Sequence, residues 1–488
     1  MKRLYFYKQN ILTAFLLLLF IFGCGQERTK IIPITTKSKE AKQEFIKGRD
    51  LFENLKFNQS LKLFESAVKK DTGFALAYYY LAQASPTAKE FYKYLNKAAS
   101  LSNKISSGER RMILALEANA DGNSAIAKDN LERLVKEYPD DERAIYLLGS
   151  FYYGQHLYQE AVDSLKKATT LAPNFSPAYN ILGYSYMDIG NYPEAEIAFK
   201  KYTELVPNEP NPYDSYAELL MKEGKYDQSI EEYNKAISRD SNFVSSYIGI
   251  SNDYNLLGKY DDARKELQIL YNRAQNNGEK KAALFSTVVS YADEGNLNMA
   301  LNEAIKLYKF DDNIKDTIGT INDLTTWGDI LFEEGRYNDA MNLYNNALHS
   351  LTSSHLSYDI MRNTRNYIFY KTIRVLINKN DLDSARVKAS IFSQNVKDVN
   401  NTDQIWLSYE LDGLIALQEK DYGKAIEELK KANMQNPYIF YYIGMAYRGQ
   451  RKYDLAKENF KEASDFNAVN NLNQAFVRKK ALRMFSEM

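Results

Sequence analysis

The sequence predicts an all-α fold, a solenoid of about twelve helix-turn-helix units rather than one globular core. Three observations support this prediction. The chain repeats itself with a period of 34 residues. It holds 39 Tyr and 24 Phe but only 10 Pro, a composition that favours packed helices. Its 488 residues exceed the roughly 250–300 residues at which single cores stop growing.

The period is clearest in the middle of the chain, where an aromatic residue marks each turn between two helices. These markers are Tyr158, Tyr192, Tyr226 and Tyr260, and successive markers are 34 residues apart. Ser124, which lies 34 residues before Tyr158, occupies the same position in the preceding repeat. Around Tyr192 the apolar and small positions are Tyr179, Leu182, Gly183, Tyr186, Ala195, Phe199 and Tyr202. Steps of three and four residues place them on one face of each helix.

Each small or special residue in this frame has a structural explanation. Gly183 and Ala195 allow the two helices of a unit to approach closely. Gly190 lies where the chain leaves the first helix, a place suited to a left-handed conformation. Pro207 precedes the next helix, where its missing N–H does no harm.

The frame persists outside the central block, so the predicted solenoid covers residues 39–466. Further markers are Phe57, Leu297, Tyr337, Leu382, Tyr422 and Tyr453, and a degenerate unit runs from Tyr78 to Ala98. The spacing stretches between Tyr260 and Tyr422. Loops or helix extensions are therefore expected in that part of the chain.

These positions together resemble the tetratricopeptide repeat. The resemblance implies a right-handed α-solenoid whose concave face is lined by first-helix residues that do not pack. In the best-registered units these candidate partner-binding residues are Tyr146, Asn180, Tyr184, Asp214, Glu218 and Asn252. Tyrosine and amide side chains form good contacts because a rigid ring buries area while its polar tip forms hydrogen bonds. The alternative is an ordinary solvated helix surface.

The N-terminus is similar to the signal of a bacterial lipoprotein. Lys2, Arg3 and Lys8 precede an apolar stretch from 11 to 22, and Gly23-Cys24 follows at once. This pattern implies that residues 1–23 are a signal peptide, that Cys24 is lipidated, and that residues 24–38 form a lipid-anchored tether. The apolar stretch is too short to span a membrane.

The C-terminus, residues 467–488, is predicted to be a capping helix. Its apolar residues are Phe476, Leu482 and Phe485, and its basic residues are Arg478, Lys479, Lys480 and Arg483. A cap with a polar outer face is the expected arrangement. The alternative is a basic docking patch.

Little in the sequence indicates chemistry. His156, His349 and His355 lack the spacing of a metal site. The acidic run from Asp311 to Asp316 lacks the glycine and glutamate of a calcium loop and is expected to be solvated. Common catalytic and nucleotide-binding motifs are missing. We therefore expect no enzyme activity, no metal and no cofactor.

The predicted function is a membrane-anchored protein–protein interaction scaffold of the bacterial cell envelope. Its expected partners are other proteins or peptides, and the membrane through lipid on Cys24. Basic and acidic residues balance at 63 each, so no nucleic acid is expected. Gly25 after the cysteine favours the outer over the inner membrane. Two alternatives stay open: a glycan-binding lipoprotein of an outer-membrane import system, and the sensory or adaptor half of a signalling system.

Overall fold

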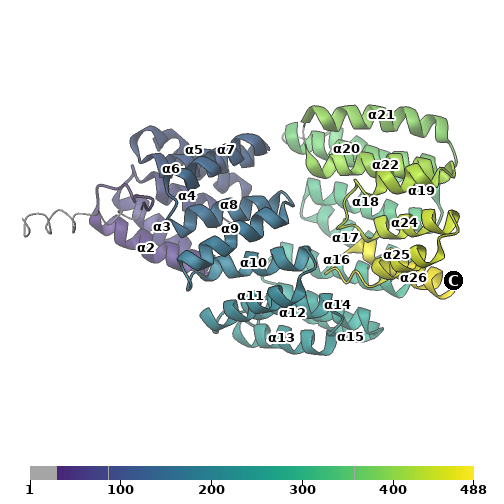
Figure 1. The fold of residues 1–488 in the computed structure, drawn as a ribbon, viewed down its shortest axis with the longest axis horizontal. Helices are drawn as coiled ribbons and strands as arrows, with labels where there is room; N and C mark the ends of the chain where they lie inside the picture. Colours follow the sequence, from purple (N-terminus) through teal and green to yellow (C-terminus); the bar gives the residue numbers. More distant parts are fainter. Residues whose placement is uncertain (1–29, 86, 355, 357, 400) are drawn as a thin grey trace, which may run out of the picture. The chain divides into compact units, whose positions relative to one another are not determined.

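The computed structural model describes residues 30–488 apart from 86, 355, 357 and 400. Every regular element in this part of the chain is helical, and Figure 1 traces the helices α2 to α26 in chain order. The chain separates into two compact units, Met1–Ser185 (unit 1) and Tyr186–Met488 (unit 2). The division falls within α10 (Ser176–Asp188).

Unit 1 begins with helical pairs of similar length. Its helices before α10 are α2 (Lys39–Glu53), α3 (Phe57–Lys70), α4 (Ala75–Ala84), α5 (Ala88–Leu101), the 3-10 helix η1 (Ser102–Lys104), α6 (Ser107–Ala120), α7 (Ser124–Glu137), α8 (Glu142–Gly154) and α9 (Tyr158–Leu171).

Unit 2 continues the same alternation. Its helices after α10 are α11 (Tyr192–Leu205), α12 (Asn211–Lys222), α13 (Tyr226–Arg239), α14 (Val244–Leu256), α15 (Tyr260–Arg273), α16 (Asn277–Glu294), α17 (Leu297–Asn313), α18 (Thr317–Glu333), α19 (Tyr337–Thr352), α20 (Tyr358–Asn378), α21 (Leu382–Val399), α22 (Thr402–Gln418), α23 (Tyr422–Leu429), α24 (Pro437–Gly449), α25 (Tyr453–Ser464) and α26 (Leu472–Ser486).

The predicted repeat frame matches these helices. From α2 to α25 they form twelve successive pairs, and the sequence markers from Phe57 to Tyr453 are the first residues of second helices. The stretched spacing reflects longer helices, because α16 to α22 have 16 to 21 residues. The predicted all-α solenoid of about twelve helix-turn-helix repeats is confirmed.

The turns between paired helices use the left-handed conformation. Gly190 has φ 78°, and Gly224 and Gly258 have similar values. His156 takes this place in its own pair with φ 59°, and its Nδ1 lies 2.9 Å from the Tyr158 hydroxyl. His156 thus has a structural position in this turn.

The small residues on first helices are required by close packing. A Cβ added to Gly149 would lie 2.8 Å from Cγ of Leu165, on the paired second helix. Gly413 and Gly444 occupy the same place in later pairs, with equally short distances to their partners. The close approach predicted for this position is therefore confirmed in both units.

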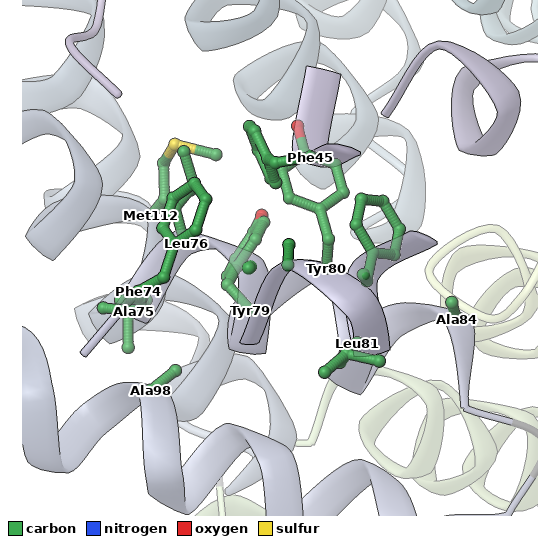
Figure 2. Packing of buried hydrophobic residues seen from close by; sticks show 14 of the residues in the cluster. Phe45, Phe74, Ala75, Leu76, Tyr79, Tyr80, Leu81, Ala84, Ala98 and Met112 are labelled. Atoms are coloured by element: carbon green, nitrogen blue, oxygen red, sulfur yellow. The ribbon is translucent and has the colours of Figure 1, made fainter. Parts of the chain in front are cut away.

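The hydrophobic core of unit 1 is formed jointly by neighbouring helix pairs. Figure 2 shows Phe45 of α2, Tyr80 of α4, Ala98 of α5 and Met112 of α6 converging on one cluster. The Phe45 ring lies 5.0 Å from Phe74 and 5.4 Å from Tyr80. One pair cannot bury such a face alone, so the pairs depend on their neighbours.

Two irregular segments also pack against the helices. Residues 30–38, predicted to be part of a free tether, lie extended along unit 1. The segment before α26 lies against α12 and α14 of unit 2. Among the described residues, no helix is long and apolar enough to cross a membrane.

Candidate partner-binding surface

The six predicted partner-binding residues all lie on first helices of pairs. Tyr146 is on α8, Asn180 and Tyr184 are on α10, Asp214 and Glu218 on α12, and Asn252 on α14. We call the side of a first helix that carries these positions its helix-A face, and we describe it separately for each unit. Three of the residues belong to unit 1 and three to unit 2.

In unit 1 the helix-A face is aromatic and partly accessible. Tyr184 and Asn180 are partly exposed, one helical turn apart on α10. The Tyr184 ring lies 6.5 Å from that of Tyr153. Tyr146 packs edge-on against Phe175 at 5.3 Å, and burial raises the pKa of its hydroxyl. Tyr146 is thus partly exposed, as Asn180 and Tyr184 are, while its ring also packs against Phe175.

An ion pair holds α8 in place behind this surface. Arg143 donates from Nε and Nη2 to the two carboxylate oxygens of Glu53, at 2.6 and 2.8 Å. Its guanidinium also lies 5.3 Å from the centre of the Phe175 ring. Two parallel hydrogen bonds fix orientation as well as distance, so α8 is tied firmly to α2.

In unit 2, Asp214 is part of the interior. It is buried, and the Ser246 hydroxyl donates to it at 2.6 Å. Burial raises the pKa of its carboxyl to about 6. The sequence placed Asp214 correctly on the first helix, but its side chain links α12 to α14.

Asn252 and Glu218 face the C-terminal segment of the same chain. The backbone N–H of Asn470 donates to Oδ1 of Asn252 at 3.0 Å. Lys222 donates from Nζ to the carbonyl of Phe466 at 2.7 Å. Glu218 helps to line a cavity of about 210 Å³ between α12 and this segment. The helix-A face of α12 and α14 is therefore covered by residues 466–471.

Helix α26 continues this internal contact. Arg478 pairs with Asp293 of α16, its Nε donating at 2.8 Å, and also donates to the carbonyl of Asn255 at 3.2 Å. Lys480 pairs with Glu333 of α18. Phe476 is buried, whereas Leu482 and Phe485 are exposed. Of the basic residues expected on a polar outer face, Arg478 thus packs inward, whereas Lys480 stays exposed while it pairs with Glu333.

A largely buried polar network joins helices of the later pairs. Lys371 of α20 donates to Asp329 of α18 at 2.6 Å, and the Tyr344 hydroxyl donates to the same carboxylate at 2.8 Å. The Tyr370 hydroxyl donates to Glu410 of α22 at 2.7 Å. The repeat pattern did not predict these hydrogen-bond partners, because the bonds do not recur at the same positions from one repeat to the next.

Two further expectations can be compared with the structure. Asp311 is buried against Lys281, with 2.7 Å between Oδ2 and Nζ, so the acidic run is not simply solvated. The reason is the position of Asp311 at the end of α17, where it faces α16. Within the described ranges, no group of three or more His, Cys, Asp or Glu side chains could hold a metal ion. Cys24 and His355 lie outside the described residues.

The helix pairs in the middle of the chain match a known family of repeats. Models of the tetratricopeptide repeat match residues 114–175, 152–210 and 211–243. No curated protein matches the chain. Among solved structures, MamA is 26% identical over 35% of this chain and 96% of its own, with a TM-score of 0.31.

Two other solved structures share this likeness. TTC0263, a tetratricopeptide repeat protein of Thermus thermophilus, is 19% identical over 44% of this chain and 98% of its own, with a TM-score of 0.29. PilF of Pseudomonas aeruginosa is 18% identical over 49% and 95%, with a TM-score of 0.31. The matched residues 114–243 include the block with the most regular period, from Ser124 to Tyr226. Residues 114–243 of this chain are therefore tetratricopeptide repeats.

Proposed function

We propose that this protein is a membrane-anchored interaction scaffold of the bacterial cell envelope, which binds other proteins or peptides on its helix-A face. The tetratricopeptide repeats support the general role of protein-interaction scaffold. The lipobox-like sequence at Cys24 supports the anchor. Both parts make separate, testable claims.

The observation that carries the binding proposal is the contrast between the two units. In unit 2 the helix-A face of α12 and α14 is covered by the chain's own residues 466–471. In unit 1, Asn180 and Tyr184 stay partly exposed beside Tyr153. A partly exposed aromatic and amide surface suits a partner, because such side chains give both apolar area and hydrogen bonds. We therefore place the docking surface on unit 1.

A variant with Asn180→Ala and Tyr184→Ala tests the docking surface. We expect it to lose proteins that co-purify with the native chain from solubilised envelopes, while its melting temperature changes little. Tyr184→Ala should account for most of the loss, on the order of 1–2 kcal/mol, because interfaces depend on a few anchors. The control is Lys166→Ala with Lys167→Ala, two exposed residues of α9. Equal capture by both double variants would contradict the proposal.

Cys24→Ser tests the anchor independently of partner binding. We expect the variant to lose palmitate labelling and to leave the membrane fraction, because the only cysteine of the chain is gone. A variant that still labels and sediments with membranes would rule out the lipid on Cys24.

A further inference from the structure

Residues 30–38, which we call the strap, lie extended along unit 1 and are held by carboxylates. The backbone N–H of Ile32 donates to Asp141 at 2.8 Å. Thr35 donates to Glu109 from its backbone N–H at 2.8 Å and from its hydroxyl at 2.5 Å. The backbone N–H of Lys37 donates to Asp71 at 2.9 Å. Three carboxylates thus hold one extended segment.

These three carboxylates lie along a single edge of unit 1. Asp141 is the N-cap of α8, Glu109 belongs to the first turn of α6, and Asp71 is the C-cap of α3 in the turn that leads to α4. Packed helices lie 8–10 Å apart, and three extended residues span about 10 Å. The strap therefore crosses the N-terminal ends of three successive first helices, from α8 back to α4.

Apolar contacts and burial strengthen this attachment. Ile32 and Ile34 pack against the unit 1 core, and Ile32 lies next to Gly108. Glu109 is 0% exposed and also forms a capping box with Ser106. A buried carboxylate needs hydrogen-bond donors, and the strap supplies two of those that reach Glu109. The strap is thus part of the folded unit.

The docked strap shortens the connection to the membrane. A free tether over residues 24–38 would reach about 50 Å, whereas the six steps from Cys24 to Lys30 reach only about 20 Å. The backbone N–H of Lys30 donates to Asp140 at 3.2 Å, just before α8. The short connection to Cys24 therefore starts at the N-terminal end of α8.

We propose that unit 1 faces the lipid bilayer with the edge formed by the N-terminal ends of α6 and α8. This proposal rests on the lipid anchor at Cys24. A free tether attached to α2 would leave unit 1 without a preferred orientation. The docked strap instead fixes one edge near the lipid and keeps the opposite ends of the same helices away from it.

Two exposed residues at opposite ends of α6 report this orientation. Lys104 lies in the turn before α6, on the strap edge, and Asp121 follows its last residue. The 14 residues of α6 separate them by about 21 Å. An azide-bearing amino acid at either site of the full chain takes a donor dye, and phosphatidylcholine vesicles carry an acceptor lipid. We expect energy transfer from position 104 to exceed that from position 121 at least twofold.

A matched pair of variants tests whether the docked strap causes the difference in energy transfer between the two dye positions. Ile32→Asp places a charge against Asp141 and the core, whereas Ile31→Asp adds the same charge at a side chain that is 57% exposed. We expect Ile32→Asp to abolish the difference between the two dyes and Ile31→Asp to preserve it. Thr35→Pro, which removes the N–H bonded to Glu109, is a second variant that releases the strap.

Equal transfer from both positions in the native protein would overturn the proposal, as would an unchanged difference in both release variants. Flotation with the vesicles is scored separately. A native chain that does not float would reject the lipid anchor of the proposed function. Coupling the thiol of Cys24 to a maleimide lipid would then still measure whether the docked strap orients unit 1.

Discussion

The close approach of paired helices can be tested with two glycines of the same helix. Gly149 and Gly154 both belong to α8. A Cβ on Gly149 would lie 2.8 Å from Cγ and 3.0 Å from Cδ2 of Leu165, and 3.2 Å from Cβ of Ser164. A Cβ on Gly154 would meet nothing within 4 Å. The two substitutions to alanine therefore differ chiefly in steric cost, although Gly154 is the last residue of α8.

The expected difference in stability between the two variants follows from this difference in steric cost. Alanine in place of helical glycine gains roughly 0.5–1 kcal/mol at either site, and this gain cancels in the comparison. Overpacking at Gly149 costs about 1–3 kcal/mol, because the added Cβ would push against Leu165, which is fully buried. We expect Gly149→Ala to be less stable than Gly154→Ala by about that amount.

Hydrogen exchange is the suitable assay, because a long repeat array does not unfold in two states. Amides of α8 and α9 should exchange about 5- to 150-fold faster in Gly149→Ala than in Gly154→Ala. The effect should fade over the neighbouring pairs, since repeats couple mainly to their neighbours. Equal exchange in the two variants would refute the close approach, and uniform loosening along the chain would refute the nearest-neighbour coupling.

Two further predictions concern unit 2. Burial raises the pKa of the Asp253 carboxyl to about 8, so the folded state holds a proton that the unfolded state releases near pH 4. Stability should therefore fall as pH rises from 4 to 8, and Asp253→Asn should be more stable than the native chain at pH 8.5 but not at pH 4, as thermal melts at both pH values would show. Arg478→Ala should cost about 3–5 kcal/mol and accelerate exchange in α26, because it leaves Asp293 buried without its partner. In the same helix, Arg483→Ala should cost less than about 1 kcal/mol, because that side chain is 80% exposed.

Local periodicity explains how much of the fold could be predicted. The marker residues fell at the starts of second helices because each pair repeats the same short-range packing. Gly190 and the small first-helix position, which Gly183 represents in the sequence analysis, were recognisable because turn conformation and helix approach each restrict a single position. His156 could be assigned to a turn because it replaces the glycine of neighbouring pairs.

The strap and the C-terminal contacts could not be predicted, because they depend on single polar contacts without a period. Asn470 and Asn252 are 218 residues apart, and Thr35 and Glu109 are 74 apart. Glu109 could be predicted to form a capping box with Ser106, but nothing indicated a third partner. Polar residues in irregular segments have no pattern that distinguishes a docked segment from a free one.

The proposed docking surface can be tested most directly by photo-crosslinking in cells. A benzophenone amino acid replaces Tyr184 on the first helix α10, and Lys167 on the second helix α9 serves as the control position. The proposal predicts discrete crosslinked species from position 184 that position 167 does not give. Crosslinks from position 167 alone, or the same species from both positions, would contradict binding on the helix-A face of unit 1.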